Sequence, residues 1–326
     1  MVRFGYTLMT EQSGPRELVK HAAAAERAGF DFAVMSDHYS PWLDEQGHSP
    51  YAWSVLGAVA QATETLDLMS FVTAPIMRYH PAVVAQKAAT VGLLSDDRFT
   101  LGVGSGENLN EHVIGQGWPP VNVRHEQLTE ALRIISALFG GGYVNFVGDH
   151  YRVDSAKLWD RPDRRVPIAT AVSGAQSVEK FAPLSDAMIA VEPDASLCEG
   201  WDSAVGPGAR KFGQQPICWD PSEEAAAKRA WAQLRWFASG WKVNSELPGP
   251  AGFAAATQHV RIDDVTAGIP CGPDLDAIVE SVSSYWEAGF TDIALVQVGV
   301  DEDPAGFFGF AREKLLPALR EAAPAG

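Results

Sequence analysis

The stretch LDLMSFVTAPIMRYHPAVVAQKAATVGLLSDDRFTLGVGSG, residues 66–106, decides the fold. Apolar residues fill 66–75 and 98–106 as they do in buried strands, and between them Pro81 opens a helical apolar pattern over 81–95. A strand, a helix and a second strand in this order predict two parallel strands joined by a crossover helix.

The same unit recurs on both sides of this stretch. Further strands are predicted over 3–8, 32–37, 166–173, 187–192, 211–219 and 291–299. Helices are predicted over 15–30, 52–63, 124–139, 175–185, 222–238, 273–290 and 304–322. Strands alternating with helices in this number predict an α/β fold, a (β/α)8 TIM barrel with insertion segments. No GxGxxG motif follows the first strand, which weighs against a doubly wound dinucleotide-binding sheet.

Two segments interrupt the alternation. Residues 143–153 are predicted to form a two-stranded excursion, and residues from about 240 to 272, rich in Pro and Gly, form an irregular or helical insertion. Because no long low-complexity linker divides the chain, we expect one barrel domain over residues 1–326.

Composition excludes several function classes. The chain has 326 residues, 46% of them hydrophobic, and a formal net charge of −16, which argues against nucleic-acid or membrane partners. The sequence shows neither a leader pattern nor an apolar run of membrane-spanning length, so we expect a cytoplasmic protein. Its three cysteines are widely separated, and we expect neither a disulfide nor a metal site.

Polar side chains follow the ends of two predicted strands, where such barrels build their active sites. Asp37 and His38 end the second strand, and Gly106 and Glu107 end the fourth. An imidazole titrates near neutrality, so His38 can take a hydroxyl proton while hydride leaves the same carbon. Glu107 can stabilise negative charge on a hydride acceptor if burial raises its pKa.

Simpler roles for the same residues stay open. His38 could cap the following loop, Glu107 could be a carboxylate favoured by a helix N-terminus, and Trp42 could pack within its loop. Ser173 could be an ordinary helix N-cap.

Four motifs carry a resemblance to a known family. They are SDHYSPW (36–42), GHSPYAWSVLGAVAQAT (47–63), RYHPAVVAQKAAT (78–90) and GVGSGENLNE (102–111). In order and spacing they resemble the luciferase-like (β/α)8 oxidoreductases that use the deazaflavin coenzyme F420, and most closely the F420-dependent glucose-6-phosphate dehydrogenase group. The close resemblance spans roughly residues 3–180 and extends more weakly to the end of the chain.

The resemblance implies roles for particular residues. His38 would be the general base on a substrate hydroxyl, Glu107 would lie near the N1 side of the deazaflavin, and Trp42 would pack beside the reacting centre. Asp37 would contact the ring or fix its loop. The cofactor-binding set is Asp37, Phe71, Val72, Ala74, Gly106, Asn110, Ala171, Val172, Ser173 and Gly174.

Three further expectations come from the resemblance alone. The Phe71–Val72 bond falls where the family has a non-prolyl cis peptide beside the deazaflavin, and the turn at 173–175 falls where it holds the phosphodiester tail. A homodimer through the second and third helices is also expected.

The sequence departs from the sugar-phosphate dehydrogenases at the substrate end. Where they use Lys and Arg to hold phosphate, VEPDASLCEGW (191–201) and DDVTAGIPCGP (263–273) offer acids such as Glu192, Asp194 and Glu199 and no cation. We therefore expect glucose 6-phosphate to be a poor substrate. Arg210, Lys211 and Lys242 are the nearby cations that could compensate.

The sequence thus favours an F420-dependent oxidoreductase that transfers hydride between an alcohol-type small molecule and the coenzyme. One alternative is a luciferase-like monooxygenase that uses FMN, and another is a non-catalytic barrel that binds a flavin-like ligand.

Overall fold

The computed structural model describes residues 1–300 and 303–324, and its centre is a closed barrel of parallel strands. The strands follow the order β1-β10-β9-β8-β7-β4-β3-β2 around the barrel, so β1 pairs with both β2 and β10. Their bounds are β1 (Arg3–Leu8), β2 (Phe32–Met35), β3 (Asp67–Ser70), β4 (Phe99–Val103), β7 (Ile168–Ala171), β8 (Ala187–Ile189), β9 (Arg210–Ile217) and β10 (Asp292–Gln297). The predicted (β/α)8 barrel is confirmed.

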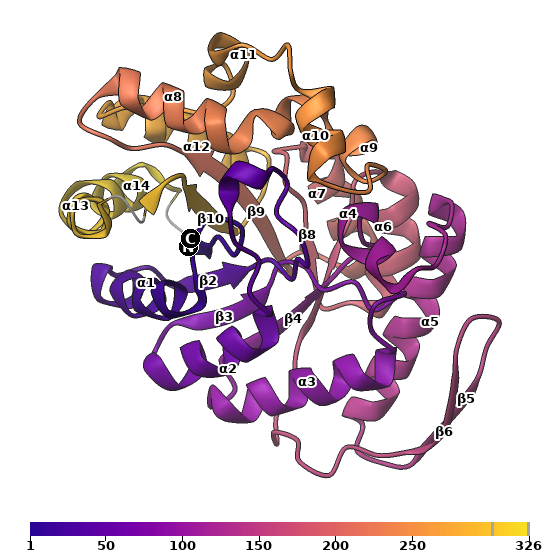
Figure 1. The fold of residues 1–326 in the computed structure, drawn as a ribbon. Helices are drawn as coiled ribbons and strands as arrows, with labels where there is room; N and C mark the ends of the chain where they lie inside the picture. The colour runs from indigo at the N-terminus through magenta and orange to yellow at the C-terminus, as the bar shows by residue number, and fades with distance from the viewer. Residues whose placement is uncertain (301–302, 325–326) are drawn as a thin grey trace.

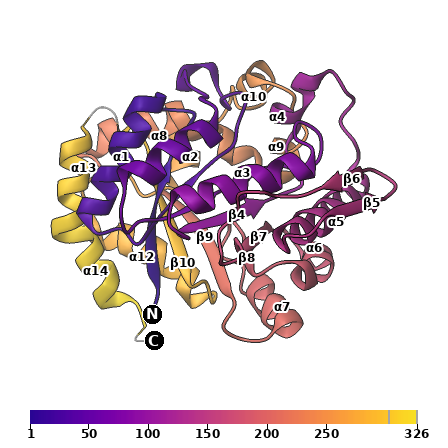
Figure 2. The ribbon, with the colours of Figure 1, turned by 90° about the horizontal axis from the view of Figure 1, so that it is seen from below.

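Helices surround the barrel (Figures 1 and 2). Their bounds are α1 (Pro15–Ala28), α2 (Ala52–Ala62), α3 (Pro81–Leu94), α4 (Asn108–Glu111), α5 (Val121–Phe139), α6 (Ala175–Phe181), α7 (Ala195–Val205), α8 (Glu223–Leu234), α9 (Trp241–Asn244), α10 (Pro250–Ala256), α11 (Ile262–Thr266), α12 (Leu275–Glu287), α13 (Pro304–Phe310) and α14 (Leu316–Ala322). Short 3-10 turns occupy 44–46, 112–114, 182–184 and 235–239, and a π-helical turn over 311–315 joins α13 to α14. Proline at the first position of α1 and of α3 suits the fixed backbone and missing donor of that residue.

The two predicted interruptions are both present. Strands β5 (Val144–Val147) and β6 (Arg152–Ala156) form an antiparallel hairpin, and the Glu130 carboxylate on α5 accepts the N–H groups of its turn at 149–151. The segment 240–272 holds the short helices α9, α10 and α11. Both ribbon views place α9 and α10 beside α4, and the Asn108 N–H donates to the Ser245 carbonyl at 3.0 Å.

Seven of the eight predicted strands end two or more residues earlier than expected, and β2 and β3 show the cause most clearly. Strand β2 stops at Met35, because Ser36 and the residues after it turn toward side-chain partners. Strand β3 stops at Ser70, and the chain continues through a cis Phe71–Val72 bond to a single bridge between Thr73 and Val103.

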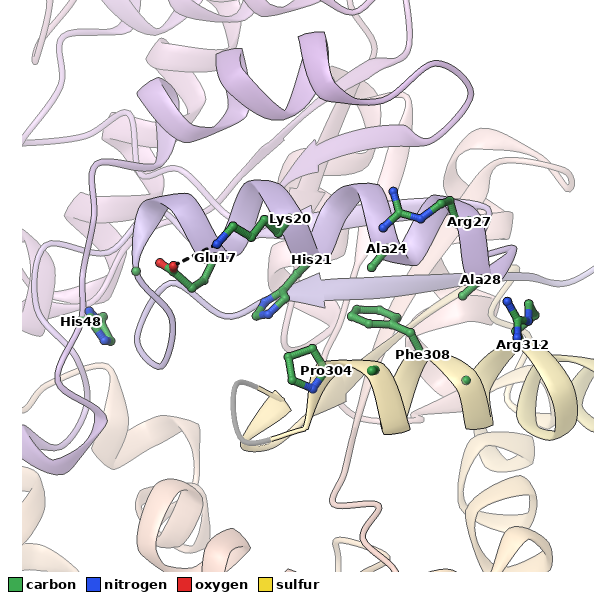
Figure 3. Close-up of a pocket in the computed structure, with 13 residues that line it drawn as sticks. Glu17, Lys20, His21, Ala24, Arg27, Ala28, His48, Pro304, Phe308 and Arg312 are labelled. Carbon is green, nitrogen blue, oxygen red and sulfur yellow. Dashed lines mark ion pairs between the residues drawn. The ribbon is translucent and has the colours of Figure 1, made fainter.

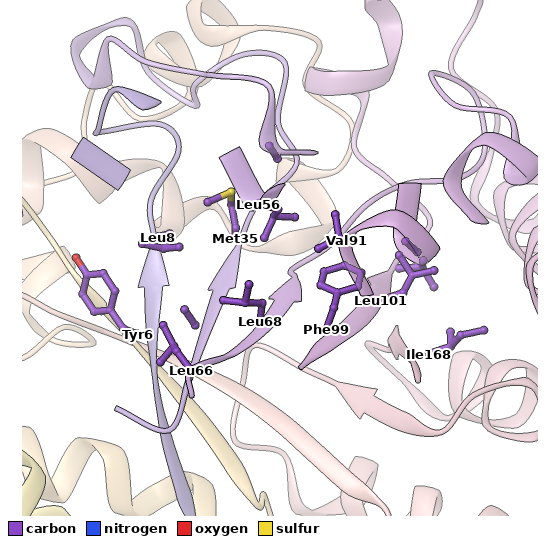
Figure 4. Close-up of a cluster of buried hydrophobic side chains, with 14 of the residues drawn as sticks. Tyr6, Leu8, Met35, Leu56, Leu66, Leu68, Val91, Phe99, Leu101 and Ile168 are labelled. Atoms are coloured by element: carbon purple, nitrogen blue, oxygen red, sulfur yellow. The ribbon is translucent and has the colours of Figure 1, made fainter. Parts of the chain in front are cut away.

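The core lies in two layers because neighbouring strand residues point to opposite faces. On the outer face Leu68 of β3 and Phe99 of β4 pack with Leu56 of α2 and Val91 of α3 (Figure 4). A separate buried cluster fills the inside of the barrel, and its members include Phe32, Val34, Met69, Ala169, Phe212 and Ala294. Since the interior is packed with side chains, a ligand can reach the strand ends but not the lumen.

The extent of the domain stays a prediction, since residues 301–302 and 325–326 lie outside those described. Within the described residues, no helix has the length and apolar character needed to cross a bilayer.

Candidate active site

Four neighbouring strands, β7, β4, β3 and β2, carry all the predicted site residues at their carboxyl ends. The segments after β3 and β4 are tied together, because the Thr73 N–H donates to the Gly102 carbonyl at 2.9 Å and the Gly104 N–H donates to Thr73 at 3.1 Å. The structure therefore gathers the predicted residues at one end of the barrel.

His38 forms a buried pair with Glu11, a residue that the sequence analysis did not single out. The Nδ1 atom of His38 lies 2.6 Å from Oε1 of Glu11, and the Ser36 hydroxyl donates to the same oxygen at 2.9 Å. Only 8% of His38 and 3% of Glu11 are exposed. Burial opposes charge on both groups, but their mutual attraction outweighs it, so the pKa of His38 is raised and the pKa of Glu11 is lowered. With Nδ1 held by Glu11, Nε2 is the nitrogen left for proton exchange.

Asp37 is buried and surrounded by donors. Its Oδ2 accepts from Trp53 Nε1 at 2.9 Å and from the Thr73 hydroxyl at 2.8 Å. Its Oδ1 accepts from the Tyr79 hydroxyl at 3.2 Å and from Arg78 Nη2 at 3.3 Å. Of the two roles expected for Asp37, these contacts support fixing the loop.

Glu107 is half-buried and immediately precedes α4 as its N-cap residue. Its Oε2 lies 3.4 Å from Asn110 Nδ2, and the Asn110 Oδ1 accepts the N–H groups of Tyr39 at 2.8 Å and Ser40 at 3.3 Å. Asn110 thus joins the loop after β2, which carries His38, to the loop after β4.

A further carboxyl near the mouth belongs to Glu111 at the end of α4. It is fully buried, accepts the Arg78 N–H at 2.7 Å, and lies 3.4 Å from Arg78 Nε. Burial raises the pKa of Glu111 to about 7, although Arg78 acts against this shift. Arg78 thereby links two carboxylates, those of Asp37 and Glu111.

Trp42 connects His38 to the insertion. Its ring meets the His38 ring edge-on with centroids 5.2 Å apart, and it stacks on Trp236 at 4.1 Å with planes 9° apart. Phe253 of α10 closes the cluster at 5.1 Å from Trp42. Trp42 thus lies beside His38, while its packing beside the reacting centre stays a prediction. The sequence analysis did not foresee the aromatic contacts with Trp236 and Phe253.

Glycine is required where β4 leaves the barrel. Gly106 has a φ of +73°, and a Cβ there would lie 3.1 Å from Ala74 Cβ and 3.2 Å from Glu111 Cγ. A Cβ on Gly104 would come within 2.7 Å of Val72 Cγ2. The backbone after β4 therefore packs directly against the segment after the cis Phe71–Val72 bond, which the resemblance led us to expect.

The turn after β7 differs from the interpretation in which Ser173 is an ordinary helix N-cap. The N-cap of α6 is Gly174, so the interpretation of Ser173 as the N-cap is wrong. The N–H groups of Ser173 and Gly174 both donate to the Ser177 hydroxyl, at 3.1 and 3.2 Å. Ala171 ends β7 and Val172 follows it beside this turn, and the contact of the turn with a phosphodiester stays a prediction.

Comparison with known proteins places this geometry in a family. The sequence model described as "Luciferase-like monooxygenase" matches residues 1–292. The chain belongs to the luciferase-like family. It is 35% identical to the F420-dependent glucose-6-phosphate dehydrogenase of Beutenbergia cavernae, covering 98% of both chains. It is 34% identical to the F420-dependent hydroxymycolic acid dehydrogenase of Mycobacterium tuberculosis, covering 97% of this chain and 88% of that protein.

A solved structure agrees with these relatives. An F420-dependent secondary alcohol dehydrogenase in complex with an F420-acetone adduct superimposes with a TM-score of 0.87 at 26% identity, covering 98% of this chain and 99% of that chain. The resemblance to luciferase-like F420-dependent oxidoreductases, drawn from the four motifs, is confirmed.

Two of the cations that could hold a phosphate in this luciferase-like barrel lie at its opposite end. Arg210 and Lys211 open β9, where Arg210 Nη2 is 2.5 Å from Asp292 Oδ1 and Lys211 Nζ is 2.7 Å from Asp202 Oδ1. A strand of this length spans about 23 Å, which is too far for either side chain to reach the mouth. Lys242 of α9 is exposed and remains the candidate cation of the three.

The three acids that the sequence analysis singled out follow β8, and their place near a substrate stays a prediction. Glu192, Asp194 and Glu199 are exposed, and Asp194 caps α7 by accepting the Ser196 N–H at 2.8 Å. Among residues 1–300 and 303–324, no group of three His, Cys, Asp or Glu side chains is arranged to hold a metal ion.

A cavity of about 740 Å³ lies away from this site, between α1 and α13 on the outside of the barrel (Figure 3). His21 and Phe308 face each other across it, with Lys20, Arg27 and Arg312 at its edges. None of the predicted site residues lines it.

Proposed function

We propose that the protein is an F420-dependent oxidoreductase that transfers hydride between an alcohol-type substrate and coenzyme F420. The observation that carries this proposal is the buried His38–Glu11 pair beside Trp42 and Glu107 at the barrel mouth. The F420-dependent dehydrogenases among the relatives support the same chemistry.

The residues at the mouth suit a deazaflavin. Phe71, Val72 and Ala74 after β3 and Ala171 and Val172 at β7 offer an apolar wall for a flat ring, and His38 and Glu107 offer polar edges. When bound there, coenzyme F420 would accept or give the hydride.

The chain's own part in the reaction is the movement of a proton. In alcohol oxidation, neutral His38 takes the hydroxyl proton at Nε2, and Glu11 at Nδ1 stabilises the imidazolium that results. In carbonyl reduction the protonated ring gives the proton back. Asn110 and Arg78 keep the loops after β2 and β4 in place during either direction.

We propose an unphosphorylated alcohol as substrate. Trp42, Trp236 and Phe253 form an apolar cover next to His38, while Arg210 and Lys211 are paired at the far end of β9. Desolvating a phosphate dianion beside Glu192 and Asp194 would be opposed by their charge.

The test is a titration of the purified protein with oxidised F420 and with FMN, followed by fluorescence. Alcohols of increasing apolar size are then screened for loss of the deazaflavin absorbance. Selective F420 binding and turnover of an unphosphorylated alcohol support the proposal. Tight FMN binding without F420 binding favours a monooxygenase, and F420 binding without turnover in either direction favours a non-catalytic barrel.

A homodimer through α2 and α3 is part of the proposal. Val83, Leu93 and Leu94 of α3 are 44%, 42% and 38% exposed, which leaves apolar surface for a second copy. The cytoplasmic location expected from the sequence stays a prediction.

A further inference from the structure

Lys87 on α3 points its ammonium group into a cage of aromatic rings. Nζ lies 3.2 Å from the centroid of the Tyr79 ring, 5.1 Å from that of Tyr51 and 5.6 Å from that of Trp53. These three rings come from the loop before α2, from α2 itself and from the loop before α3. A cation among ring faces is attracted by their quadrupoles, most strongly where water is excluded.

The ammonium is buried without a conventional partner. Nζ has no hydrogen-bond acceptor among the described residues, and its position is shielded from solvent. Burial lowers the pKa of Lys87 to about 8, with Asp37 acting to raise it and Arg78 to lower it. Because burying this charge opposes folding below that pH, a methionine of similar length would fill the cage at less cost. Its presence calls for a role other than stability.

Two of the three rings reach the candidate active site directly. Trp53 Nε1 donates to Asp37 Oδ2 at 2.9 Å, and the Tyr79 hydroxyl lies 3.2 Å from Asp37 Oδ1. Asp37 immediately precedes His38 in the chain. The cation therefore contacts the rings that supply two of the four side-chain donors to Asp37.

We infer that Lys87 is a positioning residue, which holds Trp53 and Tyr79 against Asp37 and thereby sets the geometry of the coenzyme end of the site. The expected effect of Lys87 on coenzyme binding rests on the proposed function. The contacts of Lys87 with the two rings, and of the rings with Asp37, do not depend on it.

The first test compares F420 affinity in Lys87→Met, Lys87→Arg and a control, Lys20→Met, whose side chain is 74% exposed on α1. At pH 7 we expect Lys87→Met to bind the coenzyme about tenfold more weakly, and the control to bind as the wild type does. The Tm of Lys87→Met at pH 7 is expected to be unchanged or higher. A lower Tm with unchanged affinity would assign Lys87 a structural role only and overturn the inference.

The pH dependence separates a charge effect from a shape effect. The groups that face Nζ are the Asp37 carboxylate, the Arg78 guanidinium and the phenols of Tyr51 and Tyr79, and Glu111 faces Arg78 from α4. As pH rises through about 8, wild-type Lys87 loses its proton and coenzyme affinity should fall. Lys87→Met should not show this fall in coenzyme affinity near pH 8, and Lys87→Arg should keep its coenzyme affinity to higher pH. If the affinity of Lys87→Met for F420 still falls as pH rises through about 8, the inference is overturned.

A readout without coenzyme keeps the two proposals distinguishable. In protein labelled with ¹³Cε-lysine, the signal missing from Lys87→Met should be displaced by ring currents and should titrate near pH 8. Tyr79→Phe keeps the ring and should keep this signal, while its loss of the hydroxyl should weaken F420 binding. If the wild type does not bind F420, the proposed function is wrong. If the Lys87 signal is not displaced and titrates near pH 10.5, the aromatic cage around Lys87 is wrong.

Discussion

The Nδ1 atom of His38 lies 2.6 Å from Oε1 of Glu11, although the two residues follow different strands, β2 and β1. The contact fixes which nitrogen of the ring is available and raises the pKa of that ring. A histidine used as a base on an alcohol gains in basicity from such a partner, at the cost of being protonated up to a higher pH.

Replacing Glu11 with Gln should shift the pH profile of alcohol oxidation toward acid. Oxidation needs neutral His38, so the rate rises as pH passes through the raised pKa of this residue, and loss of the carboxylate lowers that pKa. The maximal rate should fall because the imidazolium loses its counter-charge. The measurement is kcat/KM for an alcohol against pH, and an unchanged midpoint would refute the assigned pairing.

The same pair should contribute to stability over a defined pH range. The raised pKa of His38 gives stability that is full below its unfolded value of 6.5 and fades as pH rises through the folded value. The lowered pKa of Glu11 gives stability that is full above 4.5 and fades as pH falls. Glu11→Gln should therefore lower the free energy of unfolding in urea by about 3 kcal/mol, and this loss should be largest between pH 4.5 and pH 6.5. A loss that is constant from pH 4 to 9 would contradict this.

His38→Ala should abolish hydride transfer and leave F420 affinity nearly intact. A positioned base contributes about 10²–10⁴-fold to the rate, and the proposed function assigns His38 to the substrate hydroxyl rather than to the coenzyme. Stopped-flow reduction of bound F420 checks the rate, and the fluorescence titration checks the affinity. Wild-type turnover by this variant would show that the base lies elsewhere.

The sequence predicted those site residues whose position follows from the strand pattern alone. Asp37, His38, Gly106 and Glu107 come directly after apolar runs, and parallel strands of a barrel end on one side. Glu11 follows the first strand in TLMTEQS and carried the same signal, so the rule could have found it. Trp42 kept two interpretations open, and the structure shows that it both packs and adjoins His38.

Other parts of the site leave no local trace in the sequence. Trp236 lies in the 3-10 turn after α8 and Phe253 lies in the insertion, and only the folded chain brings them against Trp42. Arg78 lies in the motif RYHPAVV, but of its two carboxylate partners Asp37 follows β2 and Glu111 ends α4. Partner choice of this kind is set by tertiary packing, which periodicity does not encode.

Trp236→Ala should raise KM for apolar alcohols more than it changes kcat. Trp236 stacks on Trp42 and contributes to the apolar cover, while His38 keeps its contact with Glu11. Trp159→Ala, a change of a 75% exposed side chain near the hairpin, is the matched control and should leave both constants unchanged. If the two substitutions change KM equally, the apolar cover formed by Trp42, Trp236 and Phe253 does not belong to the substrate site.

Glucose 6-phosphate should be turned over poorly in comparison with unphosphorylated alcohols. A phosphate dianion needs donors that match its oxygens, and Arg210 and Lys211 are paired with Asp292 and Asp202 at the opposite end of β9. Steady-state F420 reduction with the sugar phosphate and with a panel of alcohols measures the difference. Lys242→Met tests whether Lys242, an exposed cation on the insertion, holds the phosphate instead. If the sugar phosphate is turned over efficiently and Lys242→Met abolishes this turnover, the phosphate site has moved onto α9. If efficient turnover survives the substitution, the mouth binds phosphate without any of these three cations.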